Sequence, residues 1–278
     1  MTHHHHDPDA TADLTPEEEK RATDEQSLDA ATTHEVIRRE GTKELERTPS
    51  ALGWSALAAG LSMGLSLLAQ AALHHALPDA EWRPLVTKLG YAVGFLAVIL
   101  GSQQLFTENT LTPMVPLLAK RTGHMFRKVA VLWAVVFVAN ILGTLLFAWA
   151  AARTQVFSLE LRQTFETIAH ETMRPSALAH FARGIAAGWI IALMVWMLPA
   201  AEGSRVLVIV IMTWLIGAAK LSHVIAGSIE AFYLAAIGAS THWHALTHFI
   251  LPALAGNMLG GITLVAALNH TQVEADKE

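Results

Sequence analysis

Long apolar stretches separated by short polar ones make up most of the chain after residue 47. A helix needs roughly 20 apolar residues to cross a bilayer. Stretches that qualify cover residues 51–73, 89–111, 129–152, 177–199, 206–239 and 246–268. Thr48-Pro49-Ser50 before the first stretch is a helix-start signal. The fifth stretch is too long for one span and contains polar residues, which predicts an interrupted helix.

Composition agrees with a membrane protein. Hydrophobic residues make up 53% of the chain and charged residues 15%, and the mean hydropathy is +0.38. These values are more apolar than those of an ordinary soluble domain. The chain has no cysteine, so disulfides, thiol chemistry and cysteine-based metal sites are excluded. The pattern therefore predicts an all-α membrane protein with six transmembrane helices.

The start of the chain is polar and acidic, and it holds most of the acidic residues of a chain whose formal net charge is −5. Such a segment is expected to be solvated and largely disordered. Alternating charges among Val36, Ile37 and Leu45 predict a short surface helix just before the first span. We divide the chain into an acidic cytoplasmic tail (1–47), a first transmembrane repeat (48–152), a connector (153–176), a second repeat (177–268) and a cytoplasmic tail (269–278).

Basic residues are distributed unevenly among the loops. They gather before the first span and between the second and third, at Arg38, Arg39, Lys43, Arg47, Lys120, Arg121, Arg127 and Lys128. The loop 240–246 has no Lys or Arg. Because basic loops stay in the cytoplasm, this bias predicts that both termini are cytoplasmic.

Two sequence echoes predict a duplicated unit. Gly101-Ser-Gln-Gln-Leu-Phe-Thr107 is echoed by Gly217-Ala-Ala-Lys-Leu-Ser-His223, and Ala139-Asn-Ile-Leu-Gly143 is echoed by Gly256-Asn-Met-Leu-Gly260. Each repeat has three spans, an odd number, so the second repeat enters the membrane upside down. Polar interruptions at matching places in such inverted repeats predict broken second and fifth helices and a transport site near the bilayer midplane.

Ionisable residues inside predicted spans mark the same region. Lys220 and His223 lie in the fifth span, where their burial in lipid is costly, and such residues usually face a water-filled path. They share a face if the segment is helical. A histidine buried only for packing is the alternative interpretation.

The chain resembles the formate–nitrite transporter family over about residues 36–270. The motifs that carry the resemblance are Thr48-Pro-Ser-Ala-Leu, Leu105-Phe-Thr107, Val138-Ala-Asn-Ile-Leu-Gly-Thr-Leu-Leu146, Gly184-Ile-Ala-Ala-Gly188, His223-Val-Ile-Ala226 and Leu251-Pro-Ala-Leu-Ala-Gly-Asn-Met-Leu-Gly-Gly261. The resemblance implies an aquaporin-like protomer with its own pore, a homo-pentamer, and a place in the bacterial inner membrane.

The resemblance also implies the pore residues. Thr107 faces the central His223. Lys220 stands where the family usually has Gly, and we expect it beside them at the pore centre as the positive charge that attracts the anion. The implied cytoplasmic slit is formed by Leu105, Phe106 and Phe95, and the periplasmic slit by Tyr91 and Ile216. The implied polar lining is Gln104, Glu108, Asn109 and Ser222. The family commonly has Glu at the positions of Gln104 and Ser222 and Asn at those of Gly188 and Gly227, so the resemblance is to a divergent branch.

The resulting functional prediction is a passive, pH-dependent channel for small monovalent anions or their conjugate acids, such as formate, nitrite or hydrosulfide. Histidine suits proton exchange because its ordinary pKa is about 6.5. The alternatives are a neutral-solute or water channel on the same fold, and a membrane sensor with a vestigial pore. We expect no enzyme activity, cofactor, metal or nucleic-acid partner. The expected partners are the small anion, membrane lipid and other copies of the chain.

Overall fold

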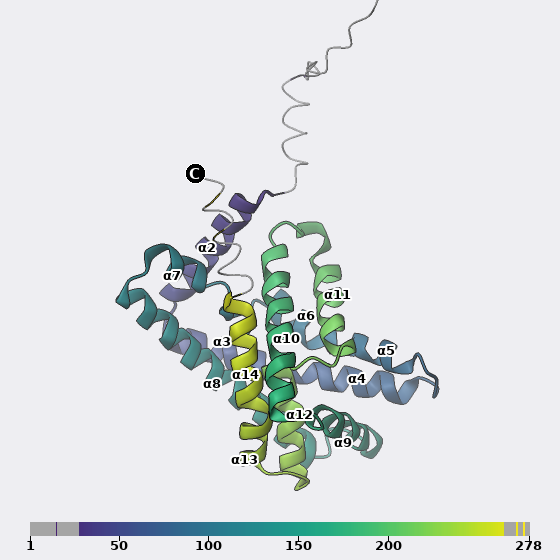
Figure 1. Ribbon diagram of the computed structural model, residues 1–278. Helices are drawn as coiled ribbons and strands as arrows, with labels where there is room; N and C mark the ends of the chain where they lie inside the picture. The colour runs from purple at the N-terminus through teal and green to yellow at the C-terminus, as the bar shows by residue number, and fades with distance from the viewer. Residues whose placement is uncertain (1–14, 16–27, 264–270, 272–274, 276–278) are drawn as a thin grey trace, which may run out of the picture.

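The computed structural model describes residues 15, 28–263, 271 and 275, and the regular elements of this part of the chain are all helical (Figure 1). The helices before the midpoint are α2 (Ala30–Glu46), α3 (Pro49–Ser62), α4 (Gly64–Ala76), α5 (Arg83–Thr87), η1 (Lys88–Tyr91), α6 (Ala92–Leu100), η2 (Glu108–Thr110), α7 (Met114–Lys120) and α8 (Gly123–Arg153). Those after it are α9 (Leu159–Met173), α10 (Ala177–Met197), η3 (Glu202–Ser204), α11 (Arg205–Ala218), α12 (Val224–Ile237), α13 (His242–His244), the π-helical η4 (Ala245–Ile250) and α14 (Leu251–Gly261).

Several of these helices begin where a side-chain hydroxyl replaces a missing backbone acceptor. Thr48 accepts from the Ala51 amide at the start of α3, where Pro49 also favours helix initiation. Thr122 caps α8 and Ser176 caps α10 in the same way. The start signal recognised in the sequence at Thr48 is therefore confirmed.

Four helical stretches in the described part are long and apolar enough to cross a membrane: Pro49–Ala76, Arg83–Leu100, Gly123–Arg153 and Ala177–Met197. They match the first four predicted spans, although the second begins earlier and leaves its helix well before residue 111. The prediction of an all-α membrane protein is confirmed. The fifth predicted span is split into α11 and α12, and the sixth, 246–268, runs past the described residues, so the count of six stays a prediction.

Helices two and five are broken, as predicted. The chain leaves α6 after Gly101 and α11 after Ala219, and the backbone takes a left-handed conformation at Ser102 (φ 51°) and Lys220 (φ 53°). Left-handed backbone ends an α-helix because it cannot continue the right-handed hydrogen-bond ladder. Lys220 is therefore outside any helix, and it does not share a helix face with His223.

The backbone hydrogen bonds of the two breaks match in a register that the sequence echo did not predict. The amide of Gln103 bonds to the carbonyl of Val98, and the amide of Leu221 bonds to the carbonyl of Ile216. Structurally, Lys220 therefore corresponds to Ser102, two positions away from the Gln104 that the echo aligned with it.

Asn140 of α8 holds the first break. Its Oδ1 accepts from the Phe106 amide at 2.9 Å. Its Nδ2 donates to the carbonyl of Gln104 at 2.9 Å and to that of Ala56 in α3 at 2.7 Å. One buried amide thus satisfies both sides of a broken backbone and ties it to a neighbouring helix.

Asn257 of α14 repeats the same three bonds in the second half. Its Oδ1 accepts from the Val224 amide at 2.8 Å, and its Nδ2 donates to the carbonyl of Ser222 at 2.8 Å and to that of Gly184 in α10 at 2.9 Å. The second echo of the sequence, which contains both asparagines, therefore has a structural cause.

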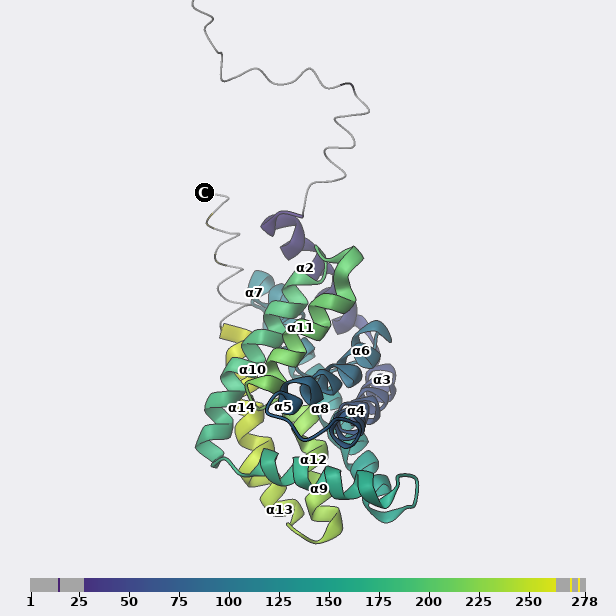
Figure 2. The same cartoon turned by 90° about the vertical axis from the view of Figure 1, so that its right-hand side faces the viewer.

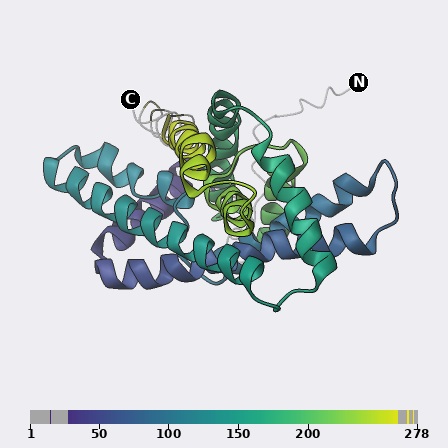
Figure 3. The ribbon, with the colours of Figure 1, turned by 90° about the horizontal axis from the view of Figure 1, so that it is seen from below.

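Small residues let the supporting helices approach closely. α3 packs along α8, and α10 packs along α14; Figure 3 shows the two pairs in separate parts of the molecule. A Cβ on Gly188 would overlap the backbone of Asn257, and one on Gly143 would overlap that of α3. The glycines therefore serve close helix packing.

The two faces of the molecule carry different elements. α2 and α7 pack together on one face, and α9 and α13 lie at the other (Figure 2). α2 covers the last part of the predicted 1–47 tail and is more than a surface helix, because its Ile37 is 0% and its Leu45 8% exposed. Residues 1–14 and 16–27 lie outside the described residues.

We predict that Asn140→Leu and Asn257→Leu each strongly destabilise the protein. Each change leaves buried backbone groups unpaired, at a cost of about 1–3 kcal/mol per group. Thermal unfolding of the detergent-solubilised protein should show a lower midpoint for both variants. Gln163→Leu, at an exposed position of α9, is the control for adding the same apolar side chain. Midpoints equal to that of the control would contradict the role of the asparagines.

Candidate functional site

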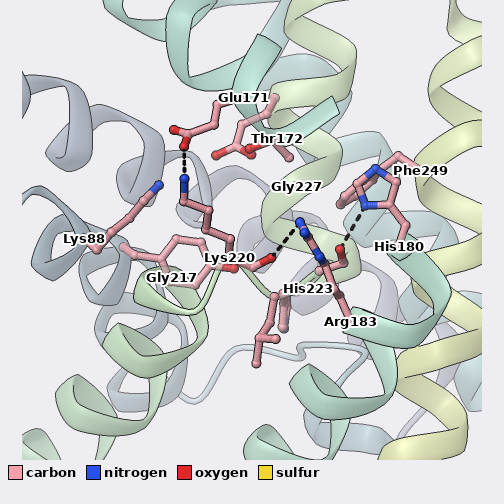
Figure 4. Close-up of a pocket in the computed structure, with 14 residues that line it drawn as sticks. Lys88, Glu171, Thr172, His180, Arg183, Gly217, Lys220, His223, Gly227 and Phe249 are labelled. Carbon is pink, nitrogen blue, oxygen red and sulfur yellow. Dashed lines mark hydrogen bonds and ion pairs between the residues drawn. The ribbon is translucent and has the colours of Figure 1, made fainter. Parts of the chain in front are cut away.

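Two cavities open on opposite faces beside the two breaks. The inner cavity, on the side of α2, has a volume of about 380 Å³ and is lined by α2, the first break and the start of α11. The outer cavity, on the side of α9, has a volume of about 60 Å³ and is lined by η1, the second break and α12 (Figure 4). The names follow the predicted orientation of the chain.

Thr107 and His223 meet between these cavities. Thr107 Oγ1 and His223 Nε2 are 2.8 Å apart, and the residues are 0% and 1% exposed. The bond joins the two repeats at the ends of their broken segments. The structure thus brings together the two residues that the family resemblance implied would face each other.

The five residues predicted to form the two slits all lie in the buried core. Leu105, Phe106, Phe95, Tyr91 and Ile216 are all buried, with exposed fractions of 7% or less. The edge of the Phe95 ring faces the His223 ring at a centroid distance of 4.9 Å, and the Tyr91 ring lies 5.3 Å from that of Phe95. Buried apolar side chains disfavour a bare anion beside them.

The hydrogen bonds of His223 define its tautomer. The residue is the N-cap of α12, and its Nδ1 accepts from the Ala226 amide at 3.2 Å. In the neutral imidazole the proton must then be on Nε2, which donates to Thr107 Oγ1. The ring presents an N–H to the gap between the repeats while its other nitrogen stabilises a helix.

A polar network lines the inner cavity. Gln104 Nε2 donates to Glu44 Oε2 of α2 at 2.8 Å, and Asn109 Nδ2 donates to Gln104 Oε1 at 3.0 Å. Glu108 lines the same cavity, and its buried Oε1 has no hydrogen-bond partner within the described residues. The predicted polar residues of the first break thus lie together, with a carboxylate from α2 that the sequence did not assign to the pore.

Lys220 lies at the mouth of the outer cavity, so the expectation that it sits at the pore centre is wrong. Its side chain is 61% exposed, and its Nζ is 2.5 Å from Glu171 Oε1 of α9. Burial opposes ionisation of Glu171, but the hydrogen bond from Lys220 and the charges of Lys88 and Lys220 lower the pKa of this carboxyl below its ordinary value. The left-handed backbone at Lys220 directs the side chain away from His223 (Figure 4).

Sequence reasoning missed several residues of the outer cavity. His180 of α10 is 1% exposed, and its Nδ1 lies 2.9 Å from Ser222 Oγ, beside His223. Arg183, one turn further along α10, donates to the carbonyl of Lys220 at 3.4 Å. Their three-residue spacing in an apolar span was an available signal of one polar helix face.

Gly227 explains one departure from the family pattern. A Cβ at this position would overlap the ring of Phe249, which lines the outer cavity. The aromatic ring thus takes the space beside α12 in which the family commonly has an asparagine side chain. His180 packs against the same ring at a centroid distance of 4.8 Å.

Two inverted helical repeats with broken helices, and a buried contact between cavities on opposite faces, define a membrane channel or transporter. Comparison with known proteins identifies the family: the chain belongs to the formate/nitrite transporter family, whose sequence profile matches residues 31–271. Members of this family are channels and transporters rather than enzymes.

Similar proteins agree with this assignment. The Inner membrane protein YfdC of Escherichia coli (strain K12) is 42% identical, over 89% of this chain and 80% of its own length. The Nitrite transporter NirC of Salmonella typhimurium is 24% identical, over 76% of this chain and 79% of its own. A solved "FNT family ion channel" has a TM-score of 0.72 at 19% identity, covering 86% of this chain and 98% of that one. A "Pentameric formate channel with formate bound" has a TM-score of 0.65 at 20% identity, with coverages of 79% and 95%.

The capping bond of His223 leads to a stability prediction. Asn is a good N-cap residue, whereas Leu fills more of the space but accepts no hydrogen bond. We expect His223→Leu to be about 1 kcal/mol less stable than His223→Asn, measured as the midpoint of thermal unfolding in detergent. A Leu variant as stable as the Asn variant would show that Nδ1 does not support α12.

Proposed function

We propose that the chain is a passive, pH-dependent pore for small monovalent anions or their conjugate acids, of the formate, nitrite or hydrosulfide type. The observation that carries the proposal is the buried Thr107–His223 hydrogen bond between two cavities on opposite faces. A contact of this kind is where a permeating solute would have to pass both repeats. Small oxyanions are favoured by the names of the relatives and by the cations at the outer mouth.

The proposed path begins at the outer cavity. Lys88, Lys220 and Arg183 line it, together with the carboxylates of Glu171 and Glu230. Cations at a mouth with low-dielectric walls raise the local concentration of anions. The solute would then meet the Nε2–H of His223 as the donor available to an anion.

The apolar barrier gives the reason for proton exchange. A bare anion loses several kcal/mol of solvation on entering it, whereas the neutral acid does not. We infer that a proton neutralises the anion for passage. It comes through water, or from the imidazolium form of His223, whose Nδ1 must then give up the bond from the Ala226 amide. Because this step consumes a proton, uptake is expected to depend on pH.

A neutral-solute or water channel is the second candidate, and one observation favours it. Lys220 is paired with Glu171, and the family's carboxylates are replaced by the uncharged Gln104 and Ser222. With this cation paired and these two positions uncharged, the pore has fewer charges with which to distinguish an anion from a neutral solute. Currents that depend on the anion present would separate the two candidates.

The setting of the pore is part of the proposal. We infer a homo-pentamer in the bacterial inner membrane, with α2 on the cytoplasmic side. The likeness in fold to a formate channel that is itself pentameric supports the assembly. The basic segments on the α2 face, and the absence of Lys and Arg from residues 240–246 at the other, support the orientation.

Flux into proteoliposomes tests the role of His223. We expect His223→Asn, which keeps the cap, to lose the pH dependence of formate and nitrite uptake and to lower uptake about tenfold or more, because the proton donor is gone. Thr167→Ala, at an exposed position of α9, serves as the control. An unchanged pH profile in the Asn variant would refute the proposed proton exchange.

The outer ion pair gives a second test with opposite signs. Lys220→Gln leaves Glu171 unpaired at the mouth and should slow anion uptake about threefold to tenfold at low salt, whereas Glu171→Gln should speed it. Both effects should shrink at high salt, because exposed charges are screened. Arg153→Gln, at the exposed end of α8, controls for the change in net charge. If neither variant changes the rate of uptake, the result would favour a neutral solute.

A further inference from the structure

A third cavity lies outside the pore, between the end of α2 and the starts of α3 and α8. It has a volume of about 220 Å³, and its lining includes Arg47, His124, Arg127, Lys128, Leu52 and Leu132. It shares only Glu44 with the lining of the inner cavity. Its chemistry is therefore separate from the solute path.

The polar part of this cavity is cationic. Arg47 is paired with Glu44 at 3.1 Å, and Glu44 also accepts from Gln104 of the pore. The side chains of Arg127, Lys128 and His124 make no ion pair or hydrogen bond within the residues that the structure describes. At least two positive charges thus face a cavity whose single carboxylate is already engaged twice.

The apolar part lies deeper along the same helices. Arg127 and Lys128 are in the first two turns of α8, and Leu132 is one turn further, about 6 Å along the axis. Leu52 lies one turn beyond Pro49 in α3. Val131, also in the lining, is 43% exposed, so this end of the cavity opens toward the surface of the helix bundle.

This order of side chains matches an anionic phospholipid. The basic groups lie where α3 and α8 begin, at the level expected for lipid headgroups, and the apolar groups lie where acyl chains begin. Arg and Lys bind phosphate through charge-assisted hydrogen bonds, and basic pockets beside transmembrane helices favour anionic headgroups. A free phosphate would leave the leucines unused, and a zwitterionic lipid would leave positive charge uncompensated.

We propose that this cavity binds the headgroup and upper acyl chain of an anionic phospholipid from the leaflet on the α2 side. The site does not depend on which solute the pore carries. Because Glu44 contacts both Arg47 and Gln104, the bound headgroup lies one side chain away from the polar network of the inner cavity.

Native mass spectrometry of the full-length protein tests the site, with phosphatidylglycerol and phosphatidylcholine as probes. We expect tighter binding of phosphatidylglycerol, and a loss of about tenfold or more in Arg127→Gln/Lys128→Gln, because two charge-assisted contacts are removed. Lys120→Gln/Arg121→Gln is the matched control: it removes the same charge from the same face, outside the cavity.

Three outcomes would overturn the proposal. Equal losses in both double variants would indicate general attraction of lipid to a basic surface. Displacement of the lipid by millimolar inorganic phosphate or glycerol phosphate would indicate a phosphate site without a lipid component. Dissociation of the oligomer in the Arg127→Gln/Lys128→Gln variant, with the control intact, would assign the face to a contact between copies of the chain.

Discussion

Each helix break leaves backbone amides and carbonyls in a region where water is scarce, and each such group would cost several kcal/mol if it stayed unpaired. Asn140 and Asn257 remove this cost with one side chain apiece, by bonding to both sides of the break and to a crossing helix. The other features follow from that solution. Glycines let the crossing helices approach closely enough for the asparagines to reach their carbonyls. The ends of the two broken segments then meet at Thr107 and His223.

Much of the architecture could be predicted from the sequence because it depends on apolar length and repetition. The spans are set by runs of hydrophobic residues, and the inverted repeat is set by the recurrence of an Asn-containing motif. The register of the breaks could not be predicted in the same way. The echoed motifs align Gly101 with Gly217. The structure instead aligns the left-handed residues Ser102 and Lys220, and their positions are fixed by backbone hydrogen bonds that no side-chain pattern encodes.

The candidate site also has residues that could be predicted from the sequence and residues that could not. Thr107, His223 and Phe95 lie together in the structure. Lys220 does not, because its neighbour in space is Glu171 on a helix that the sequence treated as a connector. His180 was missed because its partner, Ser222, belongs to a segment that is distant in the chain. Local sequence patterns could not predict these two contacts, because each joins segments that are distant in the chain.

The backbone-to-asparagine bonds also bear on how the pore could diversify. The broken segments are held by Asn140 and Asn257 through their peptide groups, so these bonds do not depend on the side chains of Gln104 and Ser222. Those side chains bond instead to Glu44 and His180. A carboxylate can therefore be replaced by an amide or a hydroxyl at these positions without loss of the bonds that hold the broken segment. A duplicated scaffold of this kind tolerates drift in selectivity, since each half can change its chemistry while both retain the same skeleton.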